Sequence, residues 1–98
     1  MPAPIFIGDE VTAAGYRLAG LRILLPEPSG VAQALHQACT ETELVLITAE
    51  YASMLPASQL KAALSARAPL VLVIPDARHR VKMPDLVVGM RAQLGIGL

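Results

Sequence analysis

Leu44–Thr48, with the sequence Leu-Val-Leu-Ile-Thr, is the stretch that decides the fold class. It is a short, unbroken apolar run, which is typical of a strand that a parallel sheet buries on both faces. Pro69–Ile74 is a second run of this kind, and Pro75 closes it. Two further mainly apolar segments, Pro4–Gly8 and Leu21–Leu25, precede these runs, so the sequence predicts four strands.

The segment after the first predicted strand has the spacing of an amphipathic helix. We expect this helix to run from an N-cap at Asp9 to about Ala19. Gly20 then suits the left-handed position that ends many helices. The apolar residues that recur three or four positions apart along it are Val11, Ala14 and Leu18.

The later helical segments are bounded by residues that start or stop helices. Ser29 can cap a helix that runs to about Cys39, and Thr40–Glu43 then connects it to the next strand. Glu50–Leu55 begins a further helical stretch, which Pro56 interrupts; this proline suits the first turn of a new helix. Beyond it we expect Leu60, Ala63 and Leu64 to face the core, and Gln59, Lys61 and Arg67 to face water.

The end of the chain is predicted to be a polar loop, Asp76–Met83, followed by an amphipathic helix that Pro84 opens. The alternation of strands and helices predicts an α/β fold. We expect a small flavodoxin-like (Rossmann-like) parallel sheet of four strands, in the order 2-1-3-4, with helices on both faces. Residues 1–75 are assigned to the α/β core, and residues 76–98 to the basic loop, C-terminal helix and tail of the same domain.

The composition of the 98 residues argues against several classes of function. Eight basic residues balance eight acidic ones and only three residues are aromatic, so we expect no nucleic-acid partner. The single cysteine, Cys39, supplies neither an internal disulfide nor a zinc site, and we expect an intracellular protein. The N-terminus lacks the pattern of a signal peptide, and the longest apolar run, Leu70–Ile74, is far shorter than the ~20 residues of a spanning helix. We therefore expect no direct membrane insertion.

Charge is divided unevenly along the chain. Residues 1–50 hold six acidic and two basic residues, whereas residues 51–98 hold two acidic and six basic ones. The basic residues are most concentrated between Arg78 and Lys82. This cluster is either a surface that meets an acidic partner or a solvated basic loop.

One pair of carboxylates stands where ligands usually bind in open α/β sheets, beyond the carboxyl end of a strand. Asp9 and Glu10 resemble the magnesium-binding acids of a phosphorylation-receiver domain. A receiver also needs a phosphoacceptor carboxylate where Thr48 stands, and a lysine after a fifth strand that is not predicted. The simpler interpretation is helix capping by Asp9 and favourable placement of Glu10 at the helix N-terminus. A degenerate receiver or small-ligand domain using these two acids is kept as the alternative function.

Two other features of the sequence have open interpretations. Gly15 lies inside a predicted helix, where it costs ~1 kcal/mol relative to alanine, so either close packing within the domain or the approach of a partner explains it. A phosphocarrier using Cys39 or a histidine is also considered, but such an acceptor follows a strand, whereas Cys39 ends a predicted helix. His36 and His79 have no second ligand at metal-binding spacing, and we expect no metal, no cofactor and no catalytic residue.

Ile7–Leu21 carries a more specific signal, because it resembles the opening of the F subunits of V-type and A-type rotary ATPases. That family begins with a strand ending in Gly-Asp, as at Gly8-Asp9, followed by Thr-x-x-Gly-aromatic and Leu-x-Gly, as at Thr12–Tyr16 and Leu18–Gly20. Three further segments are similar to the family in order along the chain: Leu46–Pro56, Pro69–Pro75, and the ending from Arg91 to Leu98.

The resemblance implies a non-catalytic central-stalk (rotor) subunit of a V/A-type rotary ATPase. It would bind the coiled-coil D subunit, alongside other subunits of the complex, and help couple ATP hydrolysis or synthesis, which occurs on other chains, to ion translocation. It also implies a cytoplasmic location, peripheral to the membrane as part of the complex. The residues expected to contact the D subunit are Tyr16, Arg17, Met90, Arg91, Leu94, Ile96 and Leu98. An equal alternative is that Met90 and Leu94 cover the sheet of their own domain.

Overall fold

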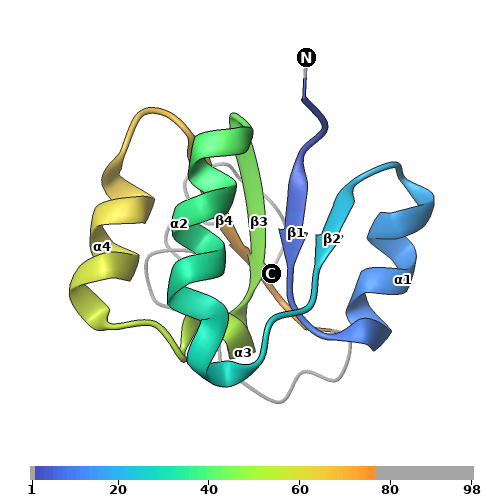
Figure 1. Cartoon of the computed structure of the whole chain (residues 1–98), viewed down its shortest axis with the longest axis horizontal. Coiled ribbons are helices and arrows are strands. Elements are labelled where there is room, and N and C mark those ends of the chain that lie inside the picture. The colour runs from blue at the N-terminus through green and yellow to red at the C-terminus, as the bar shows by residue number, and fades with distance from the viewer. Residues whose placement is uncertain (1, 77–98) are drawn as a thin grey trace, which may run out of the picture.

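Four parallel strands form one sheet in the order β2-β1-β3-β4 in the computed structural model, which describes residues 2–76 (Figure 1). The strands are β1 (Ile5–Ile7), β2 (Arg22–Leu24), β3 (Leu44–Thr48) and β4 (Leu70–Ile74). The helical elements are α1 (Glu10–Leu18), a short 3-10 turn η1 (Pro28–Gly30), α2 (Val31–Glu41), α3 (Ala49–Ala52) and α4 (Ala57–Ser65). The predicted α/β fold of flavodoxin type and its strand order are confirmed.

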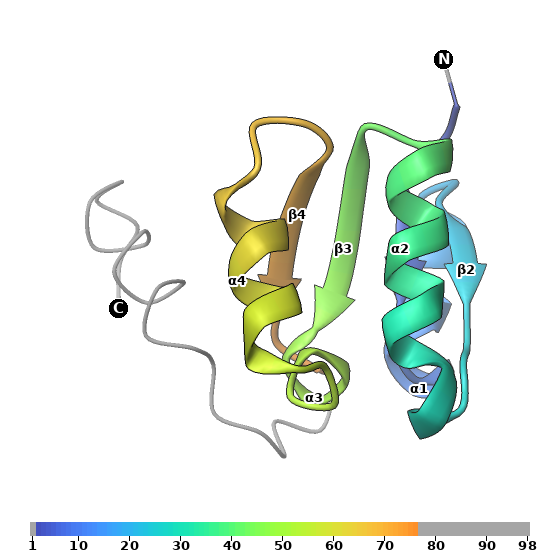
Figure 2. The same cartoon turned by 60° about the vertical axis from the view of Figure 1, so that its left-hand side comes forward.

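The alternation of side chains along β1 shows that helices cover both faces of the sheet. Ile5 and Ile7 belong to a buried cluster with Leu35 of α2, whereas Phe6, which lies between them, stacks on Tyr16 of α1. Figure 2 accordingly shows α2 and α4 in front of the sheet and α1 behind it. Because β1 is central and covered from both sides, all three of its side chains are fully buried.

The face of the sheet that α1 covers is only partly shielded within residues 2–76. Leu46 and Leu72 share a register with Phe6 and so point to the same face, but α1 packs mainly over β1 and β2. Both leucines are half-buried, and Leu70 at the start of β4 is exposed. The two faces of the sheet therefore differ: one carries the main core, and the other keeps apolar surface over β3 and β4.

The start of α2 differs from the prediction. Ser29 does not cap this helix: it lies inside the η1 turn, and the N-cap is Gly30, which makes no side-chain capping hydrogen bond. The physical reason is Pro28, whose ring presets the backbone for the first position of a helical turn, so the chain begins to coil one residue before Ser29.

The end of α2 also lies beyond the predicted position, at Glu41 instead of Cys39. Gln37 Nε2 donates to Glu41 Oε2 at 3.0 Å, and Arg22 Nη1 lies 2.8 Å from Glu41 Oε1, so side-chain contacts stabilise the two additional residues. The predicted connector Thr40–Glu43 is thus reduced to its last two residues.

The α4 region differs from the prediction in two smaller ways. Pro56 is the N-cap of α4 and not part of its first turn; its extended backbone leaves its carbonyl oxygen to accept from the Leu60 N–H at 3.1 Å. Gln59 does not simply face water: it is half-buried, and its Nε2 donates to the carbonyl oxygen of Ala32 at 2.9 Å. This contact exists because α2 and α4 lie side by side on one face of the sheet (Figure 1).

Candidate functional site

The carboxyl end of β1 is occupied by a helix cap. Asp9 Oδ2 accepts from the Thr12 backbone N–H at 3.0 Å, and Asp9 Oδ1 accepts from the Thr12 hydroxyl at 2.8 Å. Glu10 Oε1 lies 3.0 Å from Arg17 Nη1 on the outer side of α1. The predicted capping by Asp9 is therefore confirmed, and both acids of the receiver-like pair make contacts within their own helix.

The carboxyl end of β3 is built in the same way. Thr48 is 0% exposed, and its hydroxyl oxygen accepts from the Tyr51 backbone N–H at 3.2 Å, which caps α3. Within residues 2–76, no three His, Cys, Asp or Glu side chains are placed to hold a metal ion together. The position where a receiver would carry its phosphoacceptor thus holds a buried threonine that caps a helix.

Gly8 lies next to both caps, and its backbone packs closely against Thr48 and Phe6. A β-carbon at this position would lie 2.5 Å from Thr48 Cγ2 and 2.6 Å from Phe6 Cζ, both closer than atoms of a real side chain approach. The glycine of the Gly8-Asp9 pair is thus required by space at the end of β1. This is a structural explanation for one residue of the family-like motif.

The outer face of α1 exposes two large apolar residues to solvent. Val11 is 51% exposed and Leu18 is 92% exposed, and the exposed Ala14 and Gly15 lie between them. These four residues, at positions i, i+3, i+4 and i+7, form one face of the helix, which we call the α1 stripe. The spacing that predicted the helix therefore belongs to its outer side, whereas its buried residues are Thr12 and Ala13.

The predicted interface residues fall into two groups. Tyr16 is half-buried and its ring stacks on Phe6, with centroids 5.0 Å apart, whereas Arg17 is exposed beside the α1 stripe and pairs with Glu10. The other predicted contacts lie outside the described residues: Met90, Arg91, Leu94, Ile96 and Leu98. The same holds for the basic cluster from Arg78 to Lys82, for His79 and for the helix predicted from Pro84.

The structure separates the two explanations of Gly15. Apart from its two chain neighbours and the nearby backbone of α1, no atom of the described residues lies within 4 Å of the position that a β-carbon would take there. Close helix–sheet packing in this part of the chain therefore does not account for the glycine. Sequence reasoning did not identify the α1 stripe as a surface, although the unfavourable glycine inside a helix was the signal that pointed to it.

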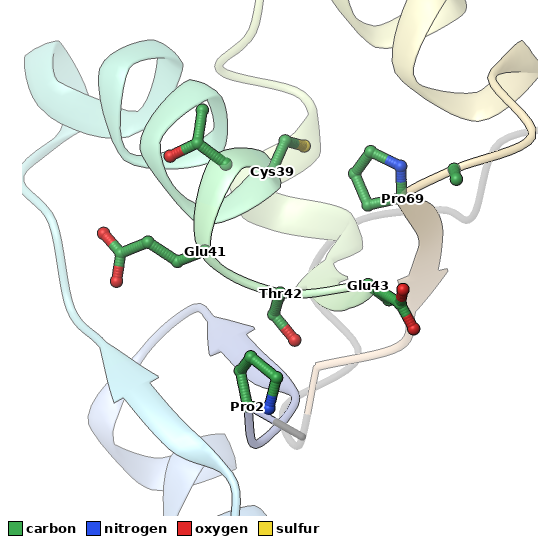
Figure 3. Close-up of a pocket in the computed structure, with 8 residues that line it drawn as sticks. Pro2, Cys39, Glu41, Thr42, Glu43 and Pro69 are labelled. Atoms are coloured by element: carbon green, nitrogen blue, oxygen red, sulfur yellow. The ribbon is translucent and has the colours of Figure 1, made fainter.

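A cavity of about 410 Å³ lies at the end of the sheet where the strands begin, opposite their carboxyl ends (Figure 3). It lies at the end of α2 and the start of β4 and is lined by Pro2, Cys39, Thr40, Glu41, Thr42, Glu43, Ala68 and Pro69. Burial raises the pKa of the Cys39 thiol, which keeps the sulfur protonated and weakens it as a nucleophile. The Thr42 hydroxyl donates to the carbonyl oxygen of Ala3 at 3.0 Å, so this edge is held by structural contacts. The phosphocarrier alternative gains no support here.

No helix within residues 2–76 has both the length and the apolar character that crossing a bilayer requires.

Comparison with known families agrees with the fold. A search of curated proteins gave no match to the chain. The family model described as "ATP synthase (F/14-kDa) subunit" matches residues 5–92, from β1 into the C-terminal segment. The match covers nearly the entire sequence, so the chain belongs to the family of ATP synthase F/14-kDa subunits.

Proposed function

We propose that this chain is a non-catalytic central-stalk subunit of a V/A-type rotary ATPase, in which it binds the coiled-coil D subunit. In this role it helps couple ATP hydrolysis or synthesis, carried out on other chains, to ion translocation. It works at the cytoplasmic side, peripheral to the membrane. The observation that carries the proposal is the family match over residues 5–92.

The carboxyl edge of the sheet is in keeping with a mechanical role. Asp9 and Thr48, which stand where α/β proteins often bind ligands, cap α1 and α3. Side chains committed to caps stabilise the domain, since one cap contributes about 1 kcal/mol to the free energy of unfolding. These contacts support a structural use of the edge.

The distribution of apolar surface supports a protein partner. The α1 stripe exposes Leu18 and Val11, and a specific protein–protein interface has an apolar centre with a polar rim. Glu10 and Arg17 provide polar groups beside it. A rotor component has to hold its neighbour under torque, which favours a buried area of at least about 1,200 Å².

The C-terminal residues predicted to contact the D subunit remain in the proposal: Met90, Arg91, Leu94, Ile96 and Leu98. Arg17 belongs to the same proposed interface, and Tyr16 contributes by holding α1 against Phe6. Truncation after Gln93 removes three of these residues, Leu94, Ile96 and Leu98. We expect weaker binding to the D subunit with the α/β core still folded; unchanged affinity would remove the tail from the interface.

Co-purification with the subunits of the same organism's ATPase tests the function. The full chain, carrying an affinity tag, is expressed with the D subunit and recovered; we expect a stable binary complex. Reconstitution of the rotary complex with and without this chain then measures ATP-driven ion transport, which we expect to fall without it. Failure to bind the D subunit, together with unchanged transport in the absence of this chain, would overturn the proposed function.

A further inference from the structure

We infer that the α1 stripe is the surface on which an apolar α-helix of the coiled-coil D subunit docks. The inference rests on the proposed function and adds to it the place and the geometry of the contact. The stripe consists of Val11, Ala14, Gly15 and Leu18, and its neighbours on the inner side of α1, Thr12 and Ala13, are buried against the sheet. Two sides of one helix thus have apolar residues, and only one of them is covered within residues 2–76.

Leu18 is the first observation. Leu18 is 92% exposed and so contributes almost nothing to the packing of residues 2–76. Burying a leucine side chain fully stabilises a complex, because its apolar surface is removed from water. With Val11 seven residues earlier on the same face, the two large apolar residues mark the ends of a two-turn contact surface.

Gly15 is the second and independent observation. Its position has open space in the described structure, so an alanine fits there and would favour the helix more than glycine does. With Ala14 beside it, the middle of the stripe projects less from the helix axis than its two ends, where Val11 and Leu18 have larger side chains. Small residues at such a point allow another helix to approach closely, within the interaxial distance of about 8–10 Å that packed helices adopt.

The length of α1 decides between a partner and a second copy of this chain. α1 has nine residues and is therefore about 13 Å long. Pairing of two α1 helices is limited to this length and falls short of the roughly 800 Å² per partner that stable interfaces bury. A helix of a long coiled coil continues beyond both ends of α1, so the stripe forms one part of a larger contact with it.

The topology argues against the chain's own C-terminal segment as the occupant. That segment starts after β4, which is separated from β2 by two strands in the sheet order. The apolar surface next to this starting point is that of Leu46 and Leu72, on the part of the α1 face that α1 itself leaves uncovered. The α1 stripe lies over β1 and β2, on the far side from that point.

The charged residues beside the stripe indicate which charges a partner helix would carry. Glu10 at the start of α1 and Arg17 near its end pair along one flank, and both side chains are more than half exposed. They form a rim of both signs, which fits a partner helix with an apolar stripe bordered by charges of both signs.

The test uses three variants of the full chain: Gly15→Gln, Leu18→Gln, and Ala62→Gln as a matched control at an exposed position of α4. Unfolding in urea and sedimentation are measured on each isolated chain, and the dissociation constant is measured with the purified D subunit. We expect Gly15→Gln to leave the isolated chain as stable or more stable, because the space is open and glutamine favours a helix. We expect both stripe variants to bind the D subunit about tenfold more weakly or worse, and Ala62→Gln to bind as the parent does.

The outcomes are distinct. If the parent binds the D subunit and all three variants bind equally well, the docking surface is wrong and the proposed function stands. If the parent does not bind the D subunit, this inference fails together with the proposed binding to that subunit, and the transport measurement then decides the rest of the proposed function. If Leu18→Gln destabilises the isolated chain, or abolishes a dimer seen in sedimentation, the stripe is covered by the chain itself or by a second copy, and the inference is overturned.

Discussion

The ring of Tyr16 stacks on the ring of Phe6, with the centroids 5.0 Å apart and the planes 19° apart. Phe6 is fully buried in the central strand, so this stack fixes which side of α1 faces the sheet. The rotation that results turns Val11 and Leu18 outward. One aromatic pair thereby sets both the inner packing of α1 and the surface that it presents.

Loss of this stack should destabilise the domain. We expect Tyr16→Leu to lower the free energy of unfolding by about 1 kcal/mol, because stacked aromatic pairs contribute ~0.5–1.5 kcal/mol beyond the area they bury. Tyr16→Phe keeps the ring and is the matched control, with little change expected. Urea denaturation followed by circular dichroism measures both; equal losses in the two variants would assign the effect to the hydroxyl group.

A side chain at Gly8 should be poorly tolerated. Gly8→Ala places a methyl group within 2.5 Å of Thr48 Cγ2, and overpacking of this kind costs about 1–3 kcal/mol. Adding Thr48→Ser removes the opposing methyl and keeps the capping hydroxyl, so it should recover part of the loss. Gly15→Ala, at an open position, is the control and should stabilise the fold by about 1 kcal/mol. If Gly8→Ala were neutral, the close approach would not constrain this position.

The cap of α1 gives a third prediction. Asp9→Ala removes both hydrogen bonds to Thr12 and should lower the free energy of unfolding by about 1 kcal/mol. Asp9→Asn retains an oxygen that accepts from the Thr12 N–H, so it should retain most of the stability. Thermal denaturation of the three proteins distinguishes the hydrogen bonds from the negative charge, since an equal loss in both variants would point to the charge.

The pair of Glu41 and Arg22 predicts a dependence of stability on pH. The hydrogen bond from Arg22, and a second from Gln37, lower the pKa of the Glu41 carboxyl below its ordinary value. A carboxyl with a lowered pKa in the folded state stabilises the fold above its unfolded pKa, of about 4.3, and loses this contribution as the pH falls through the folded value. The contribution of the Glu41 carboxylate to the stability of the fold is therefore present at neutral pH and is lost in acid.

Arg22→Gln tests this relation. We expect it to move the pKa of Glu41 upward, followed by carbon NMR of the carboxyl group, and to reduce the stability difference between neutral and acidic pH. Lys61→Gln removes an exposed positive charge on α4 and is the control, which should leave the Glu41 titration in place. An unchanged Glu41 pKa in Arg22→Gln would show that the ion pair does not hold the carboxylate.

The strands were predictable because their signal is local. Leu44–Thr48 was predicted as a strand and β3 has these bounds; β4 starts at Leu70, one residue after the predicted start at Pro69, and ends at Ile74 as predicted. The caps at Asp9 and at Gly20, whose φ is +92°, were predictable for the same reason, since each depends on one residue type at one backbone position.

The orientation of α1 was not predictable from spacing alone. Val11, Ala14 and Leu18 repeat at helical spacing, but so do Thr12, Ala13 and Tyr16 on the other side, and the first set is the more apolar. The stack of Tyr16 on Phe6 and the bond from Thr12 to Asp9 decide between the two, and both are contacts between elements or at their ends. Periodicity identifies a helix, whereas such contacts select the side that is buried.

The strand order has a consequence for synthesis of the protein. β1 leaves the ribosome before the other three strands and is also central, with β2 on one edge and β3 on the other. Its edge towards β2 can pair once residue 24 has emerged, but its other edge stays open until residues 44–48 are made. A nascent chain of intermediate length therefore exposes an unpaired edge of Ile5, Phe6 and Ile7, a short apolar template for wrong pairing. Rapid translation through the segment that encodes α2 shortens that exposure.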